Sequence, residues 1–139
     1  MMPQPKTLRD FARRYTAAWC SQDAASVASF YSPNGSLSVN GGAPAMGRGA
    51  ITSVAQGFMA AFPNLTVLMD GLDVHGERAT YRWTLIGTNT GPGGTGKRVR
   101  ISGFEEWRIG ADGLIAESRG QFDAAEYTRQ LQSGADEAP

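Results

Sequence analysis

Four long segments of alternating polar and apolar residues follow one another in the second half of the chain. They span residues 65–74, 78–88, 98–109 and 114–122, and short polar turns such as HGER and GADG separate them. Alternation with a period of two is typical of a strand with one buried face. Strands joined by tight turns pair antiparallel, so these residues predict one long β-meander.

The first half of the chain predicts helices. Apolar residues recur at helical spacing over residues 7–20 and again over residues 50–62. Asp23 is a good N-cap for a short helix between them, and SLSV, residues 36–39, reads as a short strand. Helices that precede a meander define an α+β fold. We therefore expect a cone-shaped, strongly curved antiparallel sheet wrapped around N-terminal helices.

The length of 139 residues is that of one domain. We expect a single domain over residues 7–132, flanked by flexible termini at residues 1–6 and 133–139. The first residues lack the apolar run of a signal peptide, and the chain has one cysteine, Cys20. Together these features favour a cytoplasmic protein.

Charge and motif content exclude several classes of partner. The formal net charge is zero, which gives no electrostatic basis for binding nucleic acid or an anionic membrane surface. No stretch approaches the roughly 18 apolar residues of a membrane span. His75 is the only histidine, which makes a metal site a poor prediction, and no phosphate-binding or dinucleotide fingerprint occurs. We expect neither metal nor cofactor.

One residue breaks the pattern of the strand at residues 98–109. Glu105 shares a face with Val99, Ile101, Gly103, Trp107 and Ile109. A carboxylate in such a row must be paired, protonated or exposed to a water-filled cavity. We favour the cavity, with the Glu105 carboxyl driven toward its neutral form by desolvation. Pairing with an arginine near the sheet rim, or a local slip of register, stays open.

The first helix and the last strand supply possible neighbours for Glu105. Tyr15 and Trp19 lie on the apolar face of the helix, and buried tyrosine and tryptophan side chains normally find a hydrogen-bond partner. Tyr15 either shares a cavity with Glu105 or is an ordinary core tyrosine bonded to a carbonyl. On the last strand, the small residues Ser118 and Gly120 face inward and leave space for a pocket.

The chain resembles the nuclear transport factor 2-like superfamily, which includes ketosteroid isomerases, limonene epoxide hydrolases and SnoaL-like polyketide cyclases. The resemblance extends over residues 8–132. The segments FPNLTVLMDGLDVHGERATYRWTLIGTNTG, GKRVRISGFEEWRIGADGLIAES and GQFDAAEYTRQL are most similar to the SnoaL-like group. In ketosteroid isomerases, a first-helix tyrosine that matches Tyr15 and a protonated strand carboxylic acid that matches Glu105 stabilise an oxyanion. The resemblance implies the same pair here.

Each known catalytic set of these families is broken in this sequence. The isomerases carry a general base on the first strand, where SLSVNGG offers only Asn40. The cyclases use a last-strand aspartate beside a histidine, and those positions align with Gly120 and Glu105. The aspartate of the epoxide hydrolases also aligns with Gly120. Asp123 is the nearest substitute carboxylate, although its register points it away from the cavity.

The sequence therefore predicts a protein that binds a small apolar carbonyl compound and leaves open whether it also catalyses proton transfer, as a cyclase or isomerase does. The alternatives are a non-catalytic ligand-binding domain and a dimeric interaction domain. The predicted catalytic residues are Tyr15, Glu105 and Asp123. The predicted ligand contacts are Trp19, Tyr31, Phe58, Trp83, Trp107, Ser118 and Phe122. We also expect a homodimer through the outer sheet face, at Thr80, Arg82, Thr84, Ile86, Phe104 and Arg119.

Overall fold

The computed structural model describes residues 5–135. The chain forms ten elements in the order α1 (Pro5–Cys20), α2 (Ala24–Ala28), β1 (Tyr31–Val39), β2 (Ala45–Met46), α3 (Gly47–Ala61), β3 (Thr66–His75), β4 (Arg78–Thr88), β5 (Arg98–Ile109), β6 (Ile115–Phe122) and α4 (Ala124–Ser133). Of the predicted flexible termini, residues 1–4 and 136–139 lie outside the described residues. Pro5 begins α1 and Ser133 ends α4.

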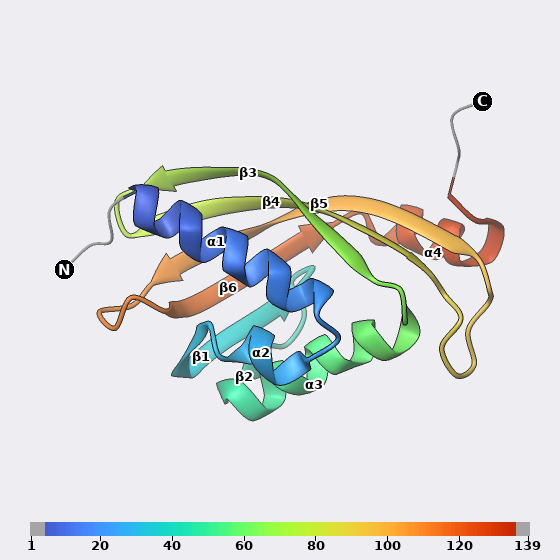
Figure 1. Cartoon of the computed structure of the whole chain (residues 1–139), viewed down its shortest axis with the longest axis horizontal. Helices are drawn as coiled ribbons and strands as arrows, with labels where there is room; N and C mark the ends of the chain where they lie inside the picture. Colours follow the sequence, from blue (N-terminus) through green and yellow to red (C-terminus); the bar gives the residue numbers. More distant parts are fainter. Residues whose placement is uncertain (1–4, 136–139) are drawn as a thin grey trace.

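The six strands form one curved sheet in the order β2-β1-β6-β5-β4-β3. The long strands β3, β4 and β5 arch over α1, and α2, α3 and β1 lie together below it (Figure 1). Helix α1 packs against β3, α3 against β1, and α4 against β5. The predicted α+β fold with a strongly curved sheet and N-terminal helices is confirmed.

The bounds of β4 and β5 coincide with the predicted strands, whereas the start of β1 differs. The sequence predicted a strand over residues 36–39 only, but β1 already begins at Tyr31, with a register shift between Tyr31 and Ser36. Strand β1 pairs with β6 in parallel, and the other strand pairs are antiparallel. The chain runs through α3 and the whole meander before it returns beside β1, and so long a connection permits parallel pairing.

The concave face of the sheet carries the predicted inward residues. Val99, Ile101, Trp107 and Glu105 are all buried on β5, as the alternation indicated. One position differs: Ile115 on β6 is fully buried although its parity predicted the outer face. A register shift between Arg108 and Ile109, opposite Ile115, accounts for this difference. The apolar face of α1 closes over this side of the sheet and buries Leu8, Phe11 and Tyr15.

Candidate functional site

Glu105 is a buried carboxyl group at the centre of the concave face. It is 7% exposed and lies directly opposite Tyr81 on β4 and Gly120 on β6. Neither neighbour carries a charge that could pair with it. No ion pair with an arginine is formed, because the partners of Glu105 among the described residues are all neutral donors. The sequence-based alternative of a rim arginine is therefore wrong.

Three short hydrogen bonds converge on one oxygen of this carboxyl group. Ser118 Oγ lies 2.7 Å from Glu105 Oε1, Trp107 Nε1 lies 2.9 Å from it, and the Tyr15 hydroxyl lies 3.0 Å from it. The Tyr31 hydroxyl is 3.5 Å from Oε1 but 2.8 Å from the Tyr15 hydroxyl. Since a hydroxyl has a single proton to donate, the shortest consistent chain runs from Tyr31 to Tyr15 to Glu105.

The second oxygen of Glu105 has far fewer partners. The one hydrogen bond to Oε2 comes from the Tyr15 hydroxyl, at 3.3 Å, which already has a shorter bond to Oε1. If the acid holds a proton, that proton therefore belongs on Oε2, because Oε1 accepts from three donors. Burial raises the pKa of Glu105, while the hydrogen bonds from Trp107, Ser118 and Tyr15 oppose the shift.

The tyrosines beside Glu105 are neutral donors. Burial, together with the adjacent Glu105 carboxyl, raises the pKa of Tyr15 and of Tyr31 well above the usual tyrosine value. The ring of Tyr15 also makes an edge-on contact with the Trp107 ring at 5.3 Å between centroids. Aromatic packing thus fixes the position from which the Tyr15 hydroxyl donates.

A pocket adjoins Glu105 on the concave face. Its buried walls come from α1, β1, β3, β4, β5 and β6, and its half-buried mouth comes from β1, α3, β4, β6 and α4. The buried lining residues are Trp19, Leu37, Val67, Tyr81, Leu85, Ile101, Glu105 and Gly120, and those at the mouth are Val39, Val54, Phe58, Trp83, Phe122 and Tyr127. Glu105 is the only carboxyl group among them.

The pocket is small. Its volume of about 60 Å³ is well below the ~150 Å³ of a cavity that takes up benzene. A ligand the size of one or two rings therefore fits only if side chains at the mouth move. Phe122 and Tyr127, which contact each other edge-on at 5.4 Å, are the aromatic pair that joins β6 to α4 there.

The predicted ligand contacts divide into two groups. Trp19, Phe58, Trp83 and Phe122 line the pocket. The other four do not line it and form a buried hydrogen-bonded cluster around Glu105: Tyr15, Tyr31, Trp107 and Ser118. Glu105 is thus the link between a buried polar cluster and the pocket. Tyr15 does not line the pocket, and its hydroxyl donates to Glu105.

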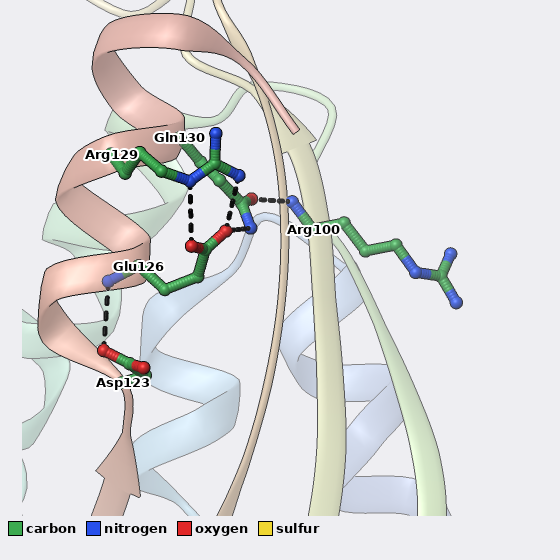
Figure 2. Close-up of polar contacts among 5 residues, drawn as sticks. All are labelled: Arg100, Asp123, Glu126, Arg129 and Gln130. Carbon is green, nitrogen blue, oxygen red and sulfur yellow. Dashed lines mark hydrogen bonds and ion pairs between the residues drawn. The ribbon is translucent and has the colours of Figure 1, made fainter. Parts of the chain in front are cut away.

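Asp123 lies outside this site. It is exposed, and its side chain caps α4 by accepting the backbone N–H of Glu126 at 3.0 Å (Figure 2). The expected parity, away from the cavity, is confirmed. A carboxylate in this position stabilises the start of a helix, and Asp123 does not line the pocket.

Helix α4 is held on β5 by a polar network beside the mouth. The backbone N–H of Arg100 donates to Gln130 Oε1 at 2.7 Å, and Gln130 Nε2 donates to Glu126 at 2.7 Å (Figure 2). Arg129 forms two hydrogen bonds to the same Glu126 carboxylate. This docking places Tyr127 over the pocket. The sequence analysis did not select Tyr127, although its position on a short amphipathic helix after the last inward residue of β6 could have indicated it.

No group of three or more histidine, cysteine or acidic side chains comes together within residues 5–135, so the described part of the chain offers no metal centre. The same residues contain no helix long and apolar enough to cross a membrane.

Comparisons with known proteins agree with this architecture. The family model for SnoaL-like polyketide cyclases matches residues 9–131. A protein with a ketosteroid isomerase-like fold from Catenulispora acidiphila, solved in complex with trimethylamine, is 16% identical with a TM-score of 0.79 and full coverage of both chains. TsrD from Streptomyces laurentii is 22% identical with a TM-score of 0.80, covering 93% of this chain and 97% of its own. The sequence matches none of the curated proteins.

Proposed function

Because this chain belongs to the SnoaL-like polyketide cyclase family, we propose that residues 7–132 form one domain that binds a small apolar carbonyl compound in the pocket beside Glu105. The observation that carries the proposal is that the two oxygens of Glu105 differ in their hydrogen-bond partners. Oε1 accepts three short hydrogen bonds from the buried cluster. Oε2 is left for the ligand.

Glu105 in its neutral form supplies a hydrogen-bond donor to the ligand carbonyl. The proton on Oε2 polarises the carbonyl and stabilises negative charge that develops on its oxygen during enolisation. Ser118, Trp107 and Tyr15 then stabilise the carboxylate if the proton moves to the ligand. Glu105 is the proposed catalytic residue, and the three donors are positioning residues. Tyr15 acts through Glu105 rather than on the ligand.

Non-catalytic binding is the second candidate function, and one observation favours it. No other carboxyl group, and no histidine, lines the pocket. Abstraction of a proton from carbon needs a base, and a positioned general base typically contributes about 10²–10⁴-fold to the rate. Because Glu105 is the only carboxyl group in the lining, it would have to donate a proton to the ligand oxygen and also remove one from the ligand carbon. We therefore propose slow proton exchange at most.

A pair of measurements tests the proposal. Binding of 2-naphthol is followed by ¹H–¹⁵N NMR, and exchange of the α-protons of 2-tetralone for deuterium is followed by ¹H NMR. We expect naphthol to shift resonances of pocket residues in the wild type, and Glu105→Gln to abolish any exchange. Glu106→Gln is the matched control, because Glu106 lies on the outer face of the sheet, where it accepts a hydrogen bond from the Thr80 hydroxyl. Absence of naphthol binding at millimolar concentration contradicts the proposal.

We also propose a cytoplasmic location and a homodimer that forms through the outer face of the sheet. On the outer face, Phe104 is 37% exposed between polar neighbours. An ion pair between Arg82 and Asp73 and a hydrogen bond between Thr84 and Ser102 order the surrounding side chains. We propose that a second copy covers this face. Sedimentation of a single monomeric species at tens of micromolar contradicts the dimer.

A further inference from the structure

The indole N–H of Trp83 is a buried donor without an acceptor. Within residues 5–135, Trp83 Nε1 is the only buried side-chain nitrogen or oxygen that lacks a hydrogen-bond partner. By contrast, the indole of Trp107 donates to Glu105. An unpaired buried donor weakens a folded protein, and such groups are rare enough in native structures that each one calls for an explanation.

Trp83 belongs to the pocket and is close to Glu105. It lies on the concave face of β4, two residues beyond Tyr81, which is directly opposite Glu105. Diagonal neighbours of this kind on paired antiparallel strands are about 7–8 Å apart. The pocket therefore carries a carboxyl group and a buried, unpaired indole N–H on diagonally neighbouring residues of β5 and β4.

The sheet beneath Trp83 is shaped to hold its ring. Trp83 pairs with Gly103 on β5, and a Cβ atom at Gly103 would lie 2.7 Å from Trp83 Cζ2. Any larger residue at position 103 would displace the indole. Phe122 contacts the indole edge-on, at 6.0 Å between ring centroids. A ring-sized ligand enters only if side chains at the mouth move. If Phe122 is the side chain that moves, the ligand takes its place beside the Trp83 indole.

We propose that Trp83 Nε1–H is the second polar contact of the pocket and donates to an oxygen at the far end of the ligand. This inference rests on the proposed function of the pocket. It specifies the ligand class as a flat aromatic or conjugated compound with oxygen functions at both ends, one facing Glu105 and one facing Trp83. The aromatic side chains of Trp19, Phe58 and Phe122 suit the flat rings between those oxygens.

Two matched probes test the inference. 2-Naphthol carries one oxygen, and 2,6-dihydroxynaphthalene carries a second at the opposite end of the same ring system. We expect the wild type to bind the two-oxygen probe roughly five- to tenfold more tightly, the range expected from one added hydrogen bond. Trp83→Phe should remove that preference. Phe58→Leu is the control: it removes ring contact without removing a donor, so it should weaken both probes and keep the preference.

The NMR signals of the indole N–H groups provide a second test, which uses the wild-type protein and does not depend on whether a variant folds. The chain has three tryptophans, hence three indole N–H signals. The two-oxygen probe should move the Trp83 signal downfield and slow its hydrogen exchange, while 2-naphthol should not. If both probes bind equally, or if the preference survives in Trp83→Phe, the inference is overturned and the proposed function stands. If neither probe binds the wild type, both are overturned.

Discussion

Ser118 Oγ donates a 2.7 Å hydrogen bond to Glu105 Oε1 from the neighbouring strand, and both side chains are buried. Ser118 pairs across the sheet with Trp107, which donates to the same oxygen. Strand pairing thus brings two donors to one atom. The sheet itself therefore fixes Oε1 as the oxygen of Glu105 that accepts from both Ser118 and Trp107.

Replacement of Ser118 by alanine should raise the pKa of Glu105. The Ser118 hydrogen bond favours the ionised form and opposes the effect of burial. A hydrogen bond to a charged group is worth about 1.5–3 kcal/mol. Its loss makes the ionised carboxylate less stable, so the pKa of Glu105 should rise further above its ordinary value. The measurement is a ¹³C NMR titration of the Glu105 carboxyl. Ser102→Ala, on the outer face, is the control, and an equal change there would refute the assignment.

The stability of the protein should depend on pH through Glu105. Its pKa is raised in the folded state above the ordinary value of 4.5. The stabilising contribution is therefore fully present below that value and is lost as the pH rises through the folded-state pKa. Urea unfolding at pH 5 and at pH 8 should show this loss in the wild type. Glu105→Gln should flatten the dependence, and an unchanged slope in that variant would exclude Glu105 as its source.

Replacement of Tyr15 by phenylalanine tests the order of the hydrogen-bonded chain. The change removes the donor to Glu105 and leaves the Tyr31 hydroxyl without its 2.8 Å partner. Loss of such buried bonds costs about 1–3 kcal/mol of unfolding free energy. Because Tyr15 does not line the pocket, naphthol affinity should change only through Glu105, by less than about tenfold. Complete loss of naphthol binding in a folded Tyr15→Phe variant would show that Tyr15 contacts the ligand directly.

Replacement of Gly120 by aspartate should supply the base that the pocket lacks. A Cβ atom at Gly120 would lie 3.4 Å from the Ser38 carbonyl oxygen and 3.8 Å from Glu105 Cγ, which are ordinary contacts. The new carboxyl group would sit beside Glu105, so one of the two would be ionised and the other neutral. We expect faster α-proton exchange of 2-tetralone, by about 10²-fold or more. Gly120→Asn is the control, and an equal gain there would argue against base catalysis.

The period-two alternation was sufficient to predict β4 and β5 to the residue and to place Glu105 on the concave face, because a half-buried strand permits only one register. The location of the Tyr15 hydroxyl was not accessible in the same way. Helical spacing shows that Tyr15 faces the core, but whether it borders the pocket depends on aromatic packing between α1 and β5. Ile115 and the start of β1 were missed because register shifts leave no local signature in the sequence.

Trp83 and Tyr127 show a second boundary of sequence-based prediction. Alternation predicted that Trp83 faces inward. Whether its N–H finds an acceptor depends on all the residues packed around it, which the sequence pattern does not give. Tyr127 lines the pocket from α4, a helix that the hydrogen bond between Arg100 and Gln130 and the ring contact with Phe122 hold against the sheet. Both features depend on three-dimensional packing between segments distant in the sequence.

The titration of Glu105 in the wild-type protein tests the central claim most directly. A ¹³C-labelled glutamate sample, with Glu105→Gln to assign the signal, gives the pKa of this carboxyl group with and without 2-naphthol. We predict a pKa above the ordinary glutamate value of 4.5 in the free protein, and a change in that pKa when the probe binds. A pKa at or below the ordinary value, unaffected by the probe, would contradict a neutral acid that faces the ligand.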